Sequence, residues 1–468
     1  MRESLRGLAP VAGAGSGAGL ALAAGRLIEG GPGHALLLPA LAVLFYLFRK
    51  HGAGRAALAG AAAGATYAAV GCYWLPRHEV AAYLSSVLLV GAAFAAAGAL
   101  ASALGRAARG RTVAGAFAGP AALLSLAFAF SFTPLGSVWA LPGDLAPARL
   151  LGAAAGIGGD GVAAALFFAA AAVAAALERR AGEAVLATCA CAGFALAGVY
   201  AVIGPERAPG KGQAPVRAAI VQPDLPYDWE WRKAHRDEIL ARLVALTRGG
   251  AAGADLVVWP QYELPGEVVP PEAAALAREL NASIVLGTYE GDRNVVVCIA
   301  PDGSARVLGA QRPPPYREQA PGEEGGLFSV RGVPFGVLLC FDDVEPGPAR
   351  DLGRAGARFL CALSNDAVFL GTREPELHLN RARLRAAETG RPVLRAIPQG
   401  VSAVISDRGR VIARAEAGTQ AVLRAEIQPR EDLTPYVRAR PARYALYVGV
   451  GLLVVLVSLR VLALVRDA

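Results

Sequence analysis

A cysteine stands where an apolar run of the chain ends and a polar turn begins. Cys340 follows Val337-Leu338-Leu339 and precedes Phe341-Asp342-Asp343. The run is typical of a buried strand, and a cysteine at its end is placed like an attacking nucleophile. Attack requires the thiolate, which a nearby base or cation stabilises. The alternative is a small buried side chain, because free cysteines often behave as hydrophobes in a core.

A second polar corner lies in the stretch WPQYELP at residues 259–265, after the apolar run Leu256-Val257-Val258. Gln261 directly follows the Trp-Pro pair, but a glutamine amide cannot act as a general base. Glu263 lies two positions later. Residues two apart share one face of a strand, so Glu263 could serve as the base in the same pocket. The alternative is a carboxylate at the rim of that pocket.

Strands that alternate with helices must position these two corners. Apolar strand runs are interrupted by helical periodicity, which we expect over residues 231–248, 271–280 and 374–389. Turn residues predict hairpins at Asp302-Gly303, around Gly332 and at Asp407-Arg408-Gly409. This alternation predicts a layered α/β sandwich over residues 217–440.

The remaining parts of the chain are apolar enough for a membrane. Hydrophobic residues make up 54% of the 468, and a spanning helix needs about 20 mainly apolar residues. Candidate segments lie near residues 7–25, 35–48, 57–75, 80–104, 114–133, 150–177, 183–203 and 444–465. We therefore expect a membrane domain over 1–203 with about seven transmembrane helices. A linker over 204–216 and a C-terminal transmembrane helix within 441–468 complete the chain. For the first segment, a cleaved signal peptide is the alternative.

Basic residues gather in alternate loops of the apolar half. The clusters are Arg49-Lys50 with Arg55, then Arg106, Arg109 and Arg111, and then Arg179-Arg180. They follow the second, fourth and sixth predicted helices, so the positive-inside rule places these loops in the cytoplasm. The chain then leaves the seventh helix on the far side. In a bacterium this predicts an inner-membrane protein whose soluble domain is periplasmic.

The charge and the cysteines exclude some classes of partner. The formal charge is +8, but the arginines are dispersed along an apolar chain, so we expect no nucleic-acid binding. The six cysteines form no paired CxxC pattern, and the five histidines are scattered. We therefore predict no metal site and no cofactor.

Several motifs of the soluble half resemble a known family. DLVVWPQYELP is similar to a W-P-E-x-A-x-P motif, CFDD to C-Y-E, and LSNDAVF to T-N-D-A-W-F. VQPDLPYDWEW is similar to the opening segment with its tryptophan, here Trp231. The stretch RARLRAAETGRPVLRAIPQGVSAVISDRGRV resembles the family's late helix and strand pair. The chain thus resembles the apolipoprotein N-acyltransferases of the carbon–nitrogen hydrolase (nitrilase) superfamily.

The resemblance implies a multi-pass α-helical membrane domain with a nitrilase-like four-layer αββα sandwich. It also implies acyl transfer through a Glu–Lys–Cys triad, with Cys340 as the cysteine. Cys340 would take a fatty acyl chain from a phospholipid as a thioester. The α-amine of a lipoprotein's diacylglyceryl-cysteine would then accept that chain. The implied partners are a phospholipid donor, a lipoprotein acceptor and the membrane, with the protein itself a monomer.

The chain departs from the family's motifs at the partners of the cysteine. Gln261 stands where the family has its glutamate, which makes Glu263 the candidate replacement. The lysine position falls on Ala310, so Arg312 or Arg317 would have to supply the positive charge to an oxyanion. Two acidic positions complete the candidate site: Glu318, which is retained, and Asp342, which stands for a glutamate.

Three functions are consistent with this pattern. The first is an active N-acyltransferase with a rearranged site. The second is a catalytically silent relative that binds lipid or lipoprotein in the cell envelope. The third is another nitrilase-type amide chemistry on a membrane-tethered domain.

Overall fold

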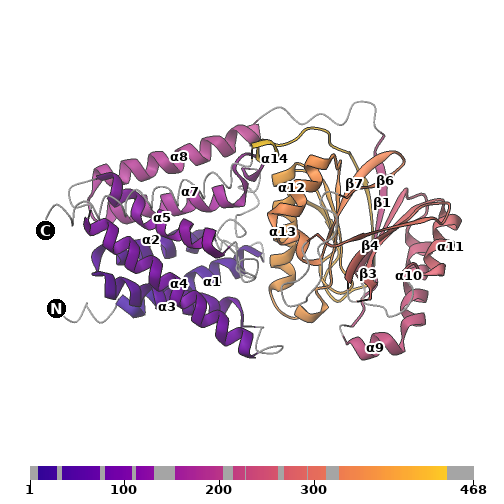
Figure 1. Ribbon diagram of the computed structural model, residues 1–468, viewed down its shortest axis with the longest axis horizontal. Coiled ribbons are helices and arrows are strands. Elements are labelled where there is room, and N and C mark those ends of the chain that lie inside the picture. The colour runs from indigo at the N-terminus through magenta and orange to yellow at the C-terminus, as the bar shows by residue number, and fades with distance from the viewer. Residues whose placement is uncertain are drawn as a thin grey trace. The chain divides into compact units, whose positions relative to one another are not determined.

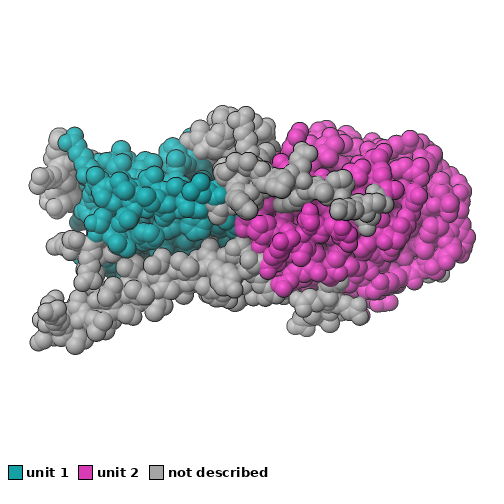
Figure 2. All heavy atoms as spheres, turned by 90° about the horizontal axis from the view of Figure 1, so that it is seen from above, with its two compact units in different colours: residues 1–153, 157–200, 440–468 teal, residues 154–156, 201–439 magenta. Residues whose placement is uncertain are grey.

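The computed structural model describes residues 9–28, 34–73, 80–107, 112–130, 153–203, 214–226, 228–261, 268–291, 293–311 and 326–439. The chain divides into two compact units, which Figure 2 colours teal and magenta. The first comprises residues 1–153, 157–200 and 440–468, and the second comprises 154–156 and 201–439. Within the described ranges, all of the strands belong to the second unit.

The apolar half of the chain is helical in its described part (Figure 1). The helices are α1 (Ala9–Ile28), α2 (His34–Lys50), α3 (Ala53–Gly71), α4 (Val80–Ala107), α5 (Thr112–Phe130), α7 (Ala154–Leu177) and α8 (Ala181–Ile203). They match seven of the predicted apolar segments, and the eighth, 444–465, lies outside the described residues. Tyr83–Arg106 and Ala154–Leu177 are long and apolar enough to cross a membrane, which indicates a membrane protein.

The core of the first unit forms around one face of α2. Leu37, Leu41, Leu44, Phe45 and Phe48 are buried there, at the three- and four-residue spacing of a helix face. The Phe45 ring packs edge-on against Phe48 and against Phe167 of α7, with ring centroids 6.4 Å apart in both pairs. This packing holds α2 against α7 within the bundle.

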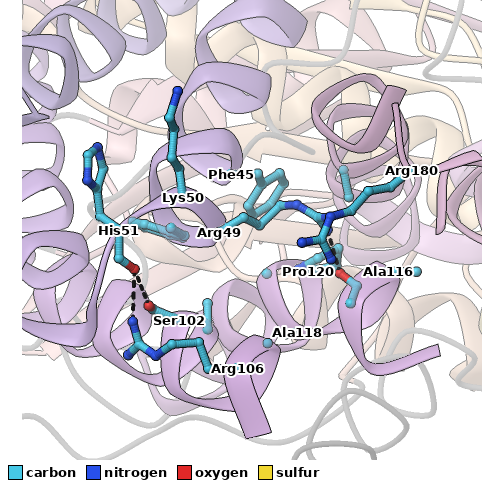
Figure 3. Close-up of a pocket in the computed structure, with 16 residues that line it drawn as sticks. Phe45, Arg49, Lys50, His51, Ser102, Arg106, Ala116, Ala118, Pro120 and Arg180 are labelled. Carbon is cyan, nitrogen blue, oxygen red and sulfur yellow. Dashed lines mark hydrogen bonds between the residues drawn. The ribbon is translucent and has the colours of Figure 1, made fainter. Parts of the chain in front are cut away.

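The basic loops of the first unit lie at one end of the bundle. Arg49 and Lys50 end α2, Arg106 lies in the last turn of α4, and Arg180 lies between α7 and α8. All four line a single cavity (Figure 3). The described basic residues at the ends of α2, α4 and α7 therefore lie at one end of this unit.

The second unit contains two mixed six-stranded sheets. In spatial order, the first holds β12 (Ala421–Ile427), β1 (Val216–Gln222), β2 (Leu256–Gln261), β3 (Ser283–Glu290), β4 (Arg293–Ile299) and β5 (Ala305–Gly309). The second holds β11 (Val411–Arg414), β10 (Ala403–Ile405), β9 (Val393–Ala396), β8 (Leu360–Leu363), β7 (Val333–Leu339) and β6 (Phe328–Val330). Strands β1-β2-β3 and β7-β8-β9 run parallel, so the residues that follow each set gather at one edge.

The two sheets pack face to face between two layers of helices (Figure 1). Ile220 and Val258 from the first sheet meet Leu339 and Leu363 from the second in a shared core. Helices α10 (Arg236–Gly250) and α11 (Pro271–Leu280) pack on the outer face of the first sheet. Helices α12 (Pro346–Ala355) and α13 (Glu374–Thr389) pack on the outer face of the second. This is the expected four-layer αββα sandwich.

Local elements mostly follow the sequence patterns. The three predicted hairpins join β4 to β5, β6 to β7, and β10 to β11. The helical stretch predicted over 231–248 is instead two helices, α9 (Trp229–Ala234) and α10. The break lies at His235, whose φ of −117° departs from helical values. A short helix, α14 (Pro435–Ala439), follows the last strand.

Candidate active site

Cys340 occupies a strained backbone position at the end of β7. It begins a short 3₁₀ helix, η2 (Cys340–Asp343), and its φ is +57°. This left-handed conformation is costly for a residue with a Cβ, and such strain often marks a functional turn. The side chain is partly exposed and packs beside the core between the sheets. The strand end therefore presents a thiol at the edge of the sandwich.

The other two cysteines of the second unit have different surroundings. Cys298 and Cys361 are buried in the core between the sheets. Burial raises the pKa of the Cys298 thiol to about 12 and that of Cys361 well above its usual value. Both remain neutral thiols at physiological pH and cannot act as nucleophiles. Partial exposure distinguishes Cys340 from them and suits it to attack on a substrate.

Gln261 ends β2 close to the Cys340 turn. Its side chain is buried and its Nε2 donates a hydrogen bond to Oδ1 of Asn294 on β4, at 3.1 Å. Gly287 of β3 lies between the two corners. A Cβ there would be 2.7 Å from the Leu339 side chain and 3.2 Å from the Gln261 Cβ. Because only glycine leaves this space, the side chain of Leu339, which precedes Cys340, packs closely on β3 beside Gln261.

Asp342 holds the turn that carries Cys340. Its buried Oδ2 accepts hydrogen bonds from the backbone N–H of Leu339, at 3.1 Å, and of Gln311, at 3.2 Å. The first bond caps the start of η2. The second ties the residues after β5 to the same turn. Both contacts go to backbone groups, so in this geometry Asp342 positions Cys340 and the segment that follows Gln311.

Behind the same turn lies a buried network that the sequence analysis did not identify. His378 of α13 contacts Asp343 through Nε2 at 2.6 Å and Asp366 through Nδ1 at 2.7 Å. Arg395 of β9 donates to the same two carboxylates, at 2.8 Å and 2.7 Å. Asp343 belongs to η2, and Asp366 follows β8. The four residues thus join the ends of β7 and β8 to β9 and α13.

The positive and negative side chains of this network offset the cost of burying each other's charge. Burial lowers the pKa of His378, but the carboxylates of Asp343 and Asp366 outweigh it and raise that pKa to about 9. Burial likewise opposes ionisation of Asp366, yet the neighbouring His378 and Arg395 lower its pKa. Two cations therefore face two anions, and both carboxylates are hydrogen-bonded on both oxygens. The network fixes the backbone on which Cys340 stands.

Comparison with known proteins assigns this site to a family. The family described as Carbon-nitrogen hydrolase matches residues 217–436. An apolipoprotein N-acyltransferase from Caulobacter vibrioides is 28% identical over 390 residues, which is 69% of this chain and 69% of that protein. A protein of the same name from Azotobacter vinelandii is 30% identical over 262 residues, 48% of this chain and 50% of its own length.

The chain belongs to the apolipoprotein N-acyltransferase family of carbon–nitrogen hydrolases. It spans about half the length of the Azotobacter relative. It likewise matches 51% of the length of a protein of the same name from Geobacter metallireducens. Membership concerns the fold and the ancestry of the site. The activity of this particular chain is a separate matter.

Solved structures of nitrilase-superfamily proteins also resemble part of this chain. Nit3 of Saccharomyces cerevisiae, a member of branch 10 of the nitrilase superfamily, is 19% identical. That match covers 46% of this chain and 91% of Nit3, with a TM-score of 0.39. A carbon–nitrogen hydrolase from Helicobacter pylori G27 is also 19% identical, covering 49% of this chain and 94% of its own, with a TM-score of 0.38.

Four of the residues that the sequence singled out for the N-acyltransferase site lie outside the described residues. They are Glu263, Arg312, Arg317 and Glu318. The described residues that directly precede them in the chain are Gln261, before the segment 262–267, and Gln311, before the segment 312–325. Gln261 lies beside Gly287, and Gln311 is bonded to Asp342. Gln261 and Gln311, the described residues before these segments, therefore lie near the Cys340 turn.

Trp231 lies apart from these residues. Its ring stacks on His235, with centroids 4.3 Å apart, and the Asp228 side chain caps its helix through the Trp231 N–H. Trp231 packs against the cluster on the outer face of the first sheet, whereas Cys340 packs against the core between the sheets. The structure therefore brings Gln261 and Asp342 to the Cys340 turn but gives Trp231 other neighbours.

Proposed function

We propose that the protein is an apolipoprotein N-acyltransferase that uses Cys340 as its nucleophile. The observation that carries this proposal is the partly exposed Cys340 thiol on a strained turn. The thiols of Cys298 and Cys361, in contrast, are buried and inert. The helical first unit suits the proposed lipid substrates, because a membrane-bound enzyme can take acyl chains directly from the bilayer. The proposed donor is a phospholipid, and the proposed acceptor is a lipoprotein.

The proposed reaction has two balanced steps. In the first, the Cys340 thiolate attacks the ester carbonyl of the phospholipid and a carbon–sulfur bond forms. The ester carbon–oxygen bond breaks, and the lysophospholipid leaves as an alcohol after taking a proton. In the second, the α-amine of a diacylglyceryl-cysteine attacks the thioester, losing a proton as the amide forms. The Cys340 sulfur leaves and is ready for another cycle.

Glu263 is the proposed proton carrier in both steps. A carboxylate positioned beside the cysteine can accept a proton from the attacking amine and donate one to the leaving alcohol. We assign stabilisation of the oxyanion to Arg312 or Arg317, because a guanidinium donates hydrogen bonds without titrating. Glu318 is proposed to contact the substrate or to orient one of these arginines. All four residues follow, in sequence, Gln261 or Gln311, which lie near the Cys340 turn.

The second candidate function is that of a catalytically silent relative, and the amide at Gln261 supports it. An amide is buried in the position that we expect to hold the family's glutamate, and its Nε2 is already bonded to Asn294. A site that lacks its base could still bind a phospholipid or a lipoprotein. The two candidates differ in one respect: only the first requires the Cys340 sulfur to form a covalent bond.

We further propose that the protein lies in a bacterial inner membrane with its α/β unit in the periplasm. The cavity lined by Arg49, Arg106 and Arg180 supports this orientation, since basic loops that share one end of a bundle remain in the cytoplasm. The linker after Ile203 leaves α8 at its other end. Reporter fusions after residue 203 and after residue 107 should respond as periplasmic and cytoplasmic, respectively.

Complementation of a strain depleted of its own N-acyltransferase tests the function. We expect the wild-type chain to restore growth and lipoprotein acylation, and Cys340→Ala to fail at equal membrane abundance. Cys340→Ala complementing as well as the wild type would exclude the proposed chemistry. Wild-type failure, with lipoprotein still co-purifying with the chain, would favour the silent relative.

A further inference from the structure

A cavity at one end of the helical unit is lined by positive charge. It has a volume of about 290 Å³, and its lining includes Arg49, Lys50, Arg106 and Arg180, with His51 beside them. Figure 3 shows Arg49 and Arg180 on one side of this cavity and Arg106 on the other. Among the described residues, none of those that line the cavity is acidic. The volume lies near the lower end of the range for small-molecule sites and suits a headgroup rather than a whole lipid.

Two of the cations are neutralised by carboxylates. Arg49 pairs with Glu178, at 3.2 Å, and with Glu183, and its Nη1 also donates to the Gly115 carbonyl at 2.7 Å. Arg180 pairs with the same two carboxylates, at 3.2 Å and 3.0 Å. This cluster ties α2, α5 and the α7–α8 turn together. Arg49 and Arg180 line one side of the cavity, and the carboxylates that neutralise them lie outside the lining.

The other two cations have no carboxylate partner among the described residues. Arg106 donates one hydrogen bond from Nη1 to the His51 carbonyl, at 3.1 Å. Lys50 contacts the Tyr46 hydroxyl and lies over its ring, 4.8 Å from the centroid. Four side-chain cations against two carboxylates leave an excess of two positive charges around the cavity. A guanidinium that faces such a space matches the oxygens of a phosphate group.

The cavity lies where a phosphate would be available. It is formed at the C-terminal ends of α2 and α4 and beside the start of α8. The chain leaves the bundle at the other end of α8, which is about 34 Å long at 1.5 Å per residue over its 23 residues. That length is comparable to the hydrocarbon thickness of a bilayer. The cavity is thus at the depth of the headgroups in the leaflet away from the linker.

We propose that this cavity is a phosphate-binding site, distinct from the Cys340 site, that takes the phosphate of an anionic phospholipid headgroup or a free phosphate. Basic pockets between membrane helices recognise such headgroups by charge and by hydrogen bonds to phosphate oxygens. Arg106 is the principal ligand, and Lys50 adds charge at the rim. Arg49 and Arg180, held by Glu178 and Glu183, line the opposite side. The site anchors the helical unit to one leaflet and does not depend on acyl transfer.

Native mass spectrometry of the full chain in detergent tests the proposal, with phosphatidylglycerol as the probe. Phosphatidylcholine serves as a zwitterionic comparison. We expect the double variant Lys50→Gln, Arg106→Gln to retain phosphatidylglycerol roughly tenfold less than the wild type. Arg55→Gln is the matched control, because Arg55 is an exposed cation near the start of α3 that does not line the cavity. It should retain the lipid almost as well as the wild type.

A charge change of the opposite sign makes the test sharper. Glu178→Gln removes one of the carboxylates that neutralise Arg49 and Arg180, so retention of phosphatidylglycerol should rise, whereas a purely structural role for the cluster predicts no gain. Inorganic phosphate distinguishes the two sources of the ligand. Competition by millimolar phosphate would identify phosphate itself as the ligand, and its failure to compete would identify the lipid headgroup.

The phospholipid proposed as acyl donor also carries a phosphate, so the decisive quantity is the difference between the double variant and Arg55→Gln. Equal losses in both would overturn the proposal, because general attraction to the basic surface would then explain the binding. An unchanged retention in the double variant would also overturn it. Size-exclusion profiles and the more conservative Arg106→Lys, which should keep most of the binding, separate loss of the site from loss of the fold.

Discussion

The Gln261 side chain is bonded to Asn294 at the edge where the two sheets meet, with Nε2 3.1 Å from Oδ1. Both residues are buried, and each satisfies a polar group that water cannot reach. The backbone N–H of Ala310 in turn donates to the Asn294 carbonyl, at 2.9 Å. Gln261 and Asn294 therefore tie the end of β2 to β4 and to Ala310 after β5, which is a structural role rather than a proton-transfer role.

Removing the Gln261 side chain should destabilise the second unit. Gln261→Ala leaves the Asn294 amide oxygen buried without this donor, a loss expected to cost about 1–3 kcal/mol in the free energy of unfolding. Chemical denaturation of the purified chain measures it. The double variant with Asn294→Ala should lose less than the sum of the two single variants, because they share one interaction. Strict additivity would show that the bond contributes nothing.

Glu263→Gln should impair acyl transfer without affecting stability. Loss of a general acid–base group lowers rates by roughly 10²–10⁴-fold, and the amide keeps the size of the side chain. The assay is transfer of a labelled acyl chain from phospholipid to a lipoprotein peptide. Glu272→Gln is the control, because Glu272 is an exposed carboxylate in the first turn of α11. Equal activity of the two variants would remove Glu263 from the mechanism.

The backbone strain at Cys340 predicts opposite effects on stability and activity. A residue with a Cβ in the left-handed region costs about 1–2 kcal/mol relative to glycine. Cys340→Gly should therefore be more stable than Cys340→Ala by about 1 kcal/mol, and both should be inactive. Thermal unfolding of the two variants side by side is the measurement. The same unfolding temperature in both would show that φ of +57° carries no strain.

The His378 network predicts a pH dependence of stability. The pKa of His378 is raised from 6.5 to about 9, so the folded chain holds the second imidazole proton of His378 more tightly than the unfolded chain. The stabilisation is complete below pH 6.5 and is lost as the pH rises through about 9, with a total on the order of 3 kcal/mol. Asp366 affects stability at acidic pH. Its pKa is lowered in the folded chain, so its contribution to the free energy of unfolding is lost as the pH falls below 3.8.

Unfolding free energies measured from pH 6.5 to about 9 show whether stability falls or rises with pH. The wild type should lose stability between pH 6.5 and 9, and His378→Gln should show a flatter profile from a lower starting value. His235→Gln is the matched control, since His235 lies at the break between α9 and α10 and stacks on Trp231, away from the network. A wild-type profile that rises with pH over this interval would contradict the assigned proton on His378.

Much of this architecture could be predicted because it depends on local patterns. Apolar runs located the helices of the first unit, and strand runs that end in polar residues located Cys340 and Gln261. The boundaries of α11 and α13 agree with the residue ranges predicted from periodicity. The break at His235 was missed, because the residues on both of its sides continue one helical pattern.

The network behind Cys340 could not be predicted in the same way. Asp343, Asp366, His378 and Arg395 belong to four different elements, and their hydrogen bonds join residues 12 to 52 positions apart. One signal was present: Asp343 and Asp366 each follow a buried strand, and the ends of neighbouring parallel strands meet at one edge. The pairing of those strands, which only the fold reveals, decides which polar residues meet.

Covalent capture of the acyl chain tests the account most directly. The purified chain should be incubated with phospholipid in the absence of a lipoprotein acceptor and digested for mass spectrometry. We predict a hydroxylamine-sensitive fatty acyl thioester on Cys340, absent from Cys340→Ala and discharged when a diacylglyceryl-cysteine peptide is added. A chain that restores lipoprotein acylation in cells yet forms no adduct on Cys340, or forms one on Cys298 or Cys361 instead, would contradict the account.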